Sequence, residues 1–106
     1  MKTLSEIETI ISNSPAVMLY FSAPTCNVCH ALKPKLFEAV EQNFGQFELV
    51  SIDISETPEI ASHYSVFAIP TLVVFLDGRE FLRKSRHMSV GEVVEEIRRP
   101  YEIMMS

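Results

Sequence analysis

Two cysteines separated by two residues, Cys26 and Cys29, are the side chains of this sequence best suited to chemistry. No other cysteine occurs among the 106 residues, and a chain of this length builds a hydrophobic core without disulfide staples. A bridge between the two cysteines closes a very short loop, so it constrains the unfolded chain little and stability is not its purpose. A thiolate attacks disulfides, and a second thiol close by resolves the mixed disulfide that results. The pair therefore indicates thiol–disulfide exchange.

The cysteines follow a buried strand and open a helix. Residues 16–21 form a continuous apolar run of six, too short for a helix and typical of a strand buried on both faces. After a break at residues 22–25, apolar side chains keep helical spacing from Cys29 to Phe44. A helix N-terminus stabilises a thiolate and lowers the pKa of a thiol below its ordinary value of about 8.5. We therefore expect Cys26 to be the exposed, attacking thiolate and Cys29 to face inward as the resolving thiol.

Apolar spacing and turn residues place the other elements along the chain. We expect a helix from the Thr3–Glu6 capping box to residue 13, strands over 47–54, 72–76 and 79–83, a short helix over 58–64, and a last helix that Ser89 opens and Pro100 stops. Asp77-Gly78 is a strong hairpin signal between the last two strands. The order predicts parallel crossovers first and an antiparallel hairpin last.

Four separate motifs occur in order along this framework. They are Phe21-Ser22-Ala23-Pro24-Thr25-Cys26-Asn27-Val28-Cys29, then Pro34, then Ile69-Pro70-Thr71, and then Asp77-Gly78. In this combination the sequence resembles the thioredoxin family over essentially its whole length. The resemblance implies an α/β, thioredoxin-like fold with a central mixed β-sheet flanked by helices, in a single domain over residues 1–106.

The resemblance also implies how the site would work. Pro70 would be cis and lie beside the cysteines, and it would shape a substrate-docking groove with Thr25, Ile69 and Thr71. The substrate would be a protein or small-molecule disulfide. Electrons would come from a donor such as a thioredoxin reductase or a thiol pool, with no metal or organic cofactor.

Several positions depart from the pattern of the family. Thr25 stands where the family usually has tryptophan, and Asn27-Val28 replaces its usual Gly-Pro between the cysteines. Tyr20 stands where the family often buries an aspartate that relays protons to the inner thiol, and Arg86 lies near a common glycine. These departures leave exchange chemistry possible, but we do not expect an ordinary general thioredoxin.

Two metal-centred alternatives use the same cysteines. Cys26 to His30 fits the haem c attachment pattern Cys-x-x-Cys-His, although that chemistry normally takes place outside the cytoplasm. A zinc site could combine Cys26 and Cys29 with two of His30, His63 and His87, but these histidines show no paired spacing. A single Cys-x-x-Cys supplies half of a tetrahedral site, so exchange chemistry is the better interpretation.

A third alternative is a thioredoxin-like binding module with little or no redox turnover. The loss of the tryptophan and of the buried acid favours it, and the retained cysteine pair opposes it. The rate of alkylation distinguishes a redox enzyme from a binding module. A redox enzyme has one cysteine that is alkylated far faster than the other, whereas an inert module has two thiols that both react slowly.

Charge and hydropathy exclude other classes of protein. The net charge of −5 disfavours nucleic acid as a partner, and the basic residues Arg79, Arg83, Lys84, Arg86 and His87 are expected on a solvated edge strand. The longest apolar run is six residues, against the roughly 18 that a membrane span needs. The first eight residues carry no apolar export signal. We expect a cytoplasmic monomer.

Overall fold

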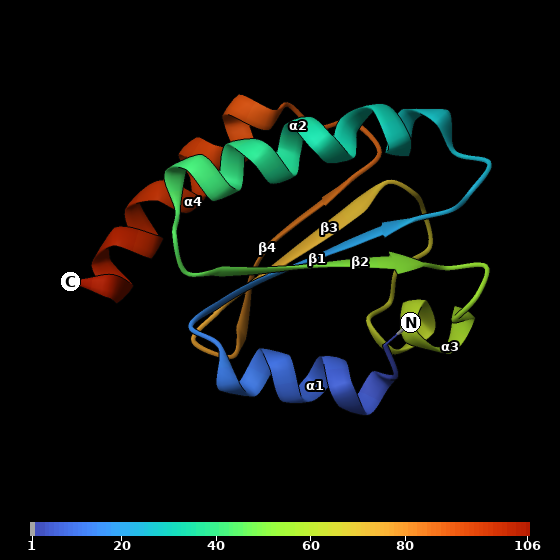
Figure 1. Cartoon of the computed structure of the whole chain (residues 1–106), viewed down its shortest axis with the longest axis horizontal. Coiled ribbons are helices and arrows are strands. Elements are labelled where there is room, and N and C mark those ends of the chain that lie inside the picture. Colours follow the sequence, from blue (N-terminus) through green and yellow to red (C-terminus); the bar gives the residue numbers. More distant parts are fainter. Residues whose placement is uncertain (1) are drawn as a thin grey trace.

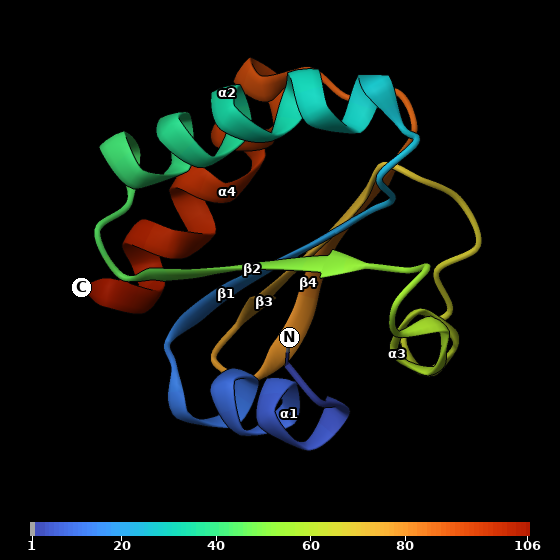
Figure 2. The same ribbon diagram turned by 45° about the vertical axis from the view of Figure 1, so that its right-hand side comes forward.

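The computed structural model describes residues 2–106, and Met1 lies outside the described residues. A four-stranded sheet is flanked by two layers of helices, α1 and α3 on one face and α2 and α4 on the other (Figure 1; Figure 2). The elements are α1 (Leu4–Asn13), β1 (Ala16–Ser22), α2 (Asn27–Asn43), β2 (Phe47–Asp53), α3 (Pro58–His63), β3 (Thr71–Leu76), β4 (Arg79–Ser85) and α4 (Val90–Met105). The predicted element order and fold class are confirmed.

Strand β1 is buried on both faces because successive side chains of a strand point to opposite sides of the sheet. Ala16, Met18 and Tyr20 pack with α2 and α4, whereas Val17, Leu19 and Phe21 pack with α1 and α3. All six of these side chains are fully excluded from solvent. The continuous apolar run in the sequence therefore reflects two cores that share one strand.

The sheet has the strand order β2-β1-β3-β4. Strands β1 and β2 are parallel, and β3 is antiparallel to both β1 and β4. Because Phe21 is paired with Thr71, the chain leaving β1 and the chain entering β3 meet at one edge of the sheet. This edge receives the cysteine segment from one side and the Ile69-Pro70 segment from the other.

Both predicted capping residues begin their helices. The Thr3 backbone N–H donates to the Glu6 carboxylate at 2.9 Å, and the Glu6 N–H donates to the Thr3 hydroxyl at 3.2 Å. The first of these bonds lowers the pKa of Glu6. At the start of α4, the N–H of Glu92 donates to the Ser89 hydroxyl at 3.4 Å. Local sequence therefore determines where these two helices begin.

The prediction that Pro100 ends the last helix is wrong, because α4 continues through it to Met105. Packing of the next residue explains the difference. The Tyr101 ring stacks on Phe47 at a centroid distance of 5.7 Å and lies 4.8 Å from Phe44. The Tyr101 hydroxyl accepts the N–H of Gln46 at 3.0 Å. These tertiary contacts offset the loss of one backbone hydrogen bond at proline.

Strand β4 lies at the edge of the sheet and carries Arg79, Arg83 and Lys84, as the sequence predicts. It extends to Ser85, two residues beyond the predicted end. Arg86 and His87, predicted on the same strand, lie beyond its end in the loop that leads to α4. Within residues 2–106, none of the helices combines the length and the apolar character that a bilayer span requires.

Candidate active site

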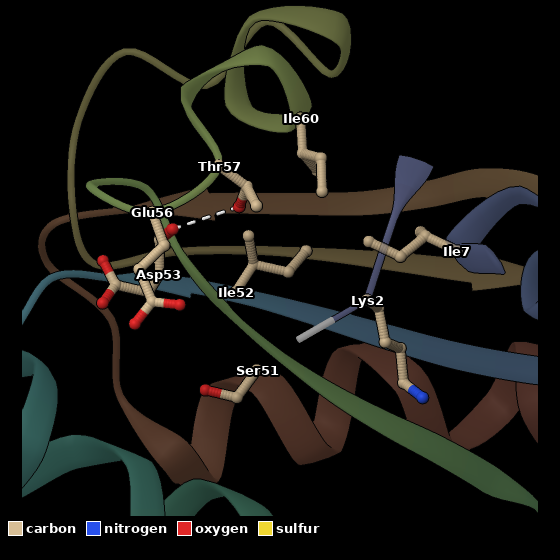
Figure 3. A pocket seen from close by; sticks show the side chains of 8 residues that line it. All are labelled: Lys2, Ile7, Ser51, Ile52, Asp53, Glu56, Thr57 and Ile60. Carbon is tan, nitrogen blue, oxygen red and sulfur yellow. Dashed lines mark hydrogen bonds between the residues drawn. The ribbon is translucent and has the colours of Figure 1, made fainter. Parts of the chain in front are cut away.

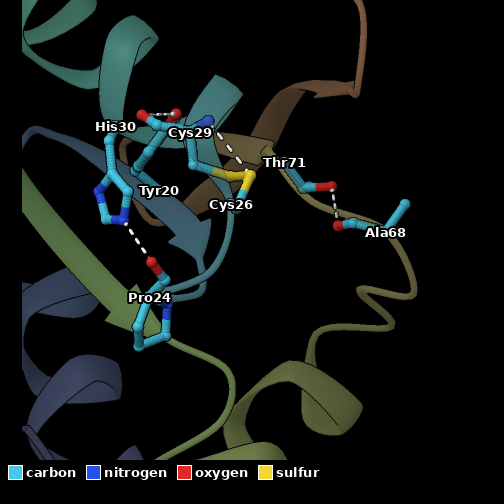
Figure 4. The surroundings of a disulfide bond; sticks show 7 residues. All are labelled: Tyr20, Pro24, Cys26, Cys29, His30, Ala68 and Thr71. Carbon is cyan, nitrogen blue, oxygen red and sulfur yellow. Dashed lines mark hydrogen bonds between the residues drawn. A yellow bond between two sulfur atoms is a disulfide. The ribbon is translucent and has the colours of Figure 1, made fainter.

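Cys26 occupies the N-cap of α2, and Cys29 lies one turn further on. The two are joined by a disulfide across a Cα–Cα distance of 5.3 Å (Figure 4). The Cys29 side chain is fully buried and Cys26 is partly exposed. The Cys26 Sγ accepts the backbone N–H of Cys29 at 3.1 Å, as an N-capping oxygen would. The predicted arrangement of one outer and one inner sulfur is confirmed.

The Ile69–Pro70 peptide bond is cis, as predicted. Of its flanking residues, Thr71 is drawn beside the disulfide and Ala68 on the far side of Thr71 (Figure 4). The Thr71 hydroxyl donates to the Ala68 carbonyl at 2.7 Å and lies 2.9 Å from the Ser85 hydroxyl. These contacts fix the loop against the end of β4, so the proline segment is held at the sheet edge beside the cysteines.

The predicted docking residues differ in how much surface they offer. Thr25 is exposed and Ile69 is partly exposed, whereas Pro70 and Thr71 are buried. The Thr71 hydroxyl is already engaged within the loop, so this residue supports the loop more than it faces solvent. The structure brings Ile69, Pro70 and Thr71 to the edge where the cysteine segment begins.

Tyr20 lies beneath the inner cysteine. Its hydroxyl donates to the backbone carbonyl of Cys29 at 2.9 Å, and its ring meets Phe37 edge-on at a centroid distance of 5.9 Å. Burial raises the pKa of Tyr20 to about 12. The phenol is therefore neutral near pH 7 and acts as a hydrogen-bond donor, unlike the carboxylate that the family often has here.

His30 ties the cysteine loop to α2. The Nε2 atom of its exposed ring lies 2.9 Å from the carbonyl oxygen of Pro24 (Figure 4). Because a carbonyl oxygen can only accept a hydrogen bond, Nε2 is the donor. His63 belongs to α3, which packs on the other face of the sheet. Among residues 2–106, no three His, Cys, Asp or Glu side chains are grouped as a metal ion would require. The structure therefore does not assemble the residues that the zinc alternative combines.

A small pocket of about 160 Å³ has no cysteine in its lining (Figure 3). It is lined by Lys2, Ile7, Ser51, Ile52, Asp53, Glu56, Thr57 and Ile60. Two of its polar side chains are engaged within the protein: the Asp53 carboxylate accepts from the hydroxyl and the backbone N–H of Ser55, which lowers the pKa of Asp53. The Thr57 hydroxyl donates to the Asp53 carbonyl. We assign no chemistry to this pocket.

Two apolar residues near the site were missed in the sequence. Phe67, two positions before Ile69, is 88% exposed, and Val28, between the cysteines, is 62% exposed. The sequence feature that could have identified Phe67 is an aromatic residue in the loop that leads into the Ile69-Pro70-Thr71 segment. Exposure itself depends on tertiary structure, which residue spacing does not reveal.

The fold and this site together define a class of protein. A disulfide at the start of a helix that follows the central strand, with a cis-proline at the same sheet edge, is the arrangement of a thioredoxin-fold dithiol redox protein. The family model described as Thioredoxin matches residues 2–99. The chain belongs to the thioredoxin family.

Known relatives agree with this assignment. The chain is 34% identical to the thioredoxin-like protein YdfQ of Bacillus subtilis over 103 residues, covering 97% of this chain and 91% of the relative. It is 33% identical to thioredoxin 1 of Synechococcus elongatus over 72 residues, covering 68% and 67% of the two chains. The structure of a mutant thioredoxin from Halobacterium salinarum superposes with a TM-score of 0.81 at 25% identity, covering 95% of this chain and 87% of that one.

The family assignment establishes the kind of reaction. This chain is a thiol–disulfide oxidoreductase with a Cys-x-x-Cys disulfide, Cys26–Cys29. Family membership implies protein disulfides as substrates and reductases as partners in general terms. Dithiol–disulfide exchange is therefore favoured over the alternative of a binding module.

Proposed function

We propose that Cys26 is the attacking thiolate and Cys29 the resolving thiol of this exchange. The observation that carries the proposal is the hydrogen bond of 3.1 Å from the Cys29 N–H to the Cys26 Sγ at the N-cap of α2. In the reduced protein the same N–H and the positive end of the helix stabilise a thiolate at Cys26. The fully buried Cys29 cannot meet a large substrate first.

The reaction proceeds in two displacements. The Cys26 thiolate attacks one sulfur of the substrate disulfide, so a bond to Cys26 forms, the substrate bond breaks, and the other substrate sulfur leaves as a thiolate and takes a proton from water. Cys29 then loses its proton and attacks the Cys26 Sγ, which closes the Cys26–Cys29 disulfide and releases the second substrate thiol. Two electrons pass from protein to substrate. A reductase or a thiol pool restores the dithiol.

The proton of Cys29 needs an acceptor in the second displacement. Tyr20, which lies beneath Cys29, does not supply one, because its phenol is neutral and donates to the Cys29 carbonyl. We infer that water or the departing thiolate of the substrate takes this proton. Compared with a carboxylate at this position, Tyr20 therefore slows the second displacement, by Cys29, more than the first, by Cys26.

Substrate docking is assigned to the cis-proline segment. Within residues 2–106, the backbone N–H and C=O of Ile69 make no backbone hydrogen bond, so they can pair with an extended substrate segment. Pro70 and Thr71 hold this segment in place. The exposed Thr25, directly before Cys26 in the sequence, is assigned to the same docking surface.

We extend the proposal to residues 1–106 as a unit. Residues 1–106 act as a single domain and as a cytoplasmic monomer, reduced by a donor such as a thioredoxin reductase or a thiol pool. The exchange needs no metal or organic cofactor in this scheme, because the two cysteines carry both electrons.

Alkylation of the reduced protein tests the assignment of the two cysteines. With limiting iodoacetamide at pH 7, we expect Cys26 to be carbamidomethylated at least roughly tenfold faster than Cys29, because Cys26 is the more exposed and the more ionised thiol. Peptide mass spectrometry of a time course measures both rates. Equal rates, or a faster Cys29, would exclude the proposed roles.

A further inference from the structure

An open groove of about 500 Å³ lies next to the disulfide, between the start of α2 and the loop that joins β4 to α4. It is lined by Val28, Leu32, Arg86, His87, Met88, Ser89 and Glu92. Val28 connects the groove to the site, because it stands between the two cysteines in the sequence. A substrate chain whose sulfur reaches Cys26 therefore passes within reach of the groove.

Arg86 is held where the groove meets the cis-proline segment. Its backbone N–H donates to the carbonyl of Pro70 at 2.6 Å, and its φ angle is 63°. This left-handed region disfavours residues with a Cβ atom, and glycine would adopt it without strain. A long cationic side chain at a position where glycine would be less strained indicates a functional role for the side chain.

The cation of Arg86 is unpaired, in contrast to its neighbours. Arg83 forms an ion pair with Glu80 at 2.9 Å, and Lys84 forms one with Glu96 at 3.0 Å. Within residues 2–106, the side chains of Arg86 and His87 have neither an ion pair nor a hydrogen bond. In a chain of net charge −5, this leaves an available guanidinium in the groove that Val28 also lines.

We propose that Arg86 selects disulfide substrates that carry a carboxylate side chain close to their reactive cysteine. The substrate is an acidic stretch of protein whose carboxylate lies in the groove and pairs with the guanidinium. Glu92 is the single carboxylate among the groove residues, and it opposes this attraction. The inference rests on the proposed attack by Cys26 and adds the substrate class to it.

Two matched probes test the selectivity. Each is a peptide with one cysteine in a mixed disulfide with 2-thiopyridine, and the residues on both sides of the cysteine are glutamate in one probe and glutamine in the other. Attack by Cys26 forms the bond to the peptide sulfur and releases thiopyridone, which is followed by absorbance in a stopped-flow instrument. The reaction of 2-mercaptoethanol with both probes corrects for their intrinsic reactivity.

The reduced parent is expected to react about fivefold faster with the glutamate probe at low ionic strength, the advantage that a good surface ion pair gives. Arg86→Gln and Arg86→Gly should bring the ratio close to one, and Glu92→Gln should raise it. The matched control is Arg79→Gln, which removes an exposed cation from the far end of β4 and should leave the ratio unchanged. Added salt should lower the ratio of the parent.

Two results would overturn the selectivity: a ratio near one in the parent, or a fivefold ratio that survives in both Arg86 variants. A separate result would show that the proposed attack by Cys26 is wrong. If Cys26→Ser releases thiopyridone as fast as the parent does, the attack by Cys26 is wrong, whatever the ratio between the probes.

Discussion

Replacing Cys26 by serine is expected to reduce disulfide exchange to background, a loss of more than about a thousandfold. A hydroxyl does not ionise near neutral pH, so the variant lacks the nucleophile. Serine also caps helices well, so the start of α2 should be preserved and the loss should be chemical. The measurement is the rate of reduction of a model protein disulfide with dithiothreitol as the electron source.

The control for this variant is stability. In urea denaturation, reduced parent and Cys26→Ser should agree within about 1 kcal/mol, because the N-cap contact to the Cys29 N–H passes to the serine oxygen. Retention of a tenth or more of the parental rate by a folded Cys26→Ser protein would contradict the role assigned to Cys26.

Replacing Tyr20 by alanine is expected to lower the free energy of unfolding by about 3–5 kcal/mol. The Tyr20 side chain is fully buried in the centre of β1, it packs edge-on against Phe37, and its hydroxyl holds the Cys29 carbonyl. Alanine leaves a cavity between the sheet and α2. A domain of this size is stable by only about 5–15 kcal/mol, so the loss is a large part of the total. Urea denaturation of the reduced protein measures it.

Tyr20→Phe separates the ring from the hydroxyl. We expect it to cost only about 1 kcal/mol, the net value of one hydrogen bond. The pKa of Tyr20 rises from 10.0 to about 12 on folding, so its contribution is present below pH 10 and is lost as the pH rises toward 12. Tyr20→Phe should remove this part of the alkaline loss of stability. A phenylalanine variant as unstable as the alanine variant, or an unchanged alkaline slope, would contradict this account.

Most of the fold follows from local patterns in the sequence. The apolar run of β1 has one explanation, a strand with a core on each face, and the capping residues Thr3 and Ser89 begin α1 and α4 as expected. Pro100 shows where local rules fail. Its effect on α4 depends on the aromatic cluster around Tyr101, whose members Phe44 and Phe47 lie more than fifty residues earlier in the sequence.

The parts of the site that could be predicted from the sequence are those that follow from the type of a residue and its position in the chain. The Cys26–Cys29 pair and the cis-proline at Pro70 could be identified because their types and positions fit a known family pattern. The left-handed backbone of Arg86 and the exposure of Phe67 could not, because both are consequences of how distant segments pack. The hydrogen bond from Tyr20 to the Cys29 carbonyl likewise arises only when β1 and α2 come together.

The Cys29→Ser variant tests most directly whether Cys26 attacks the substrate and Cys29 resolves the mixed disulfide. The reduced variant is mixed with a protein disulfide, quenched with acid, and digested without reductant for mass spectrometry. We predict a long-lived mixed disulfide between the substrate and Cys26, because the side chain that would release it is absent. Turnover of Cys29→Ser at the parental rate, with no substrate bound at Cys26, would contradict the account.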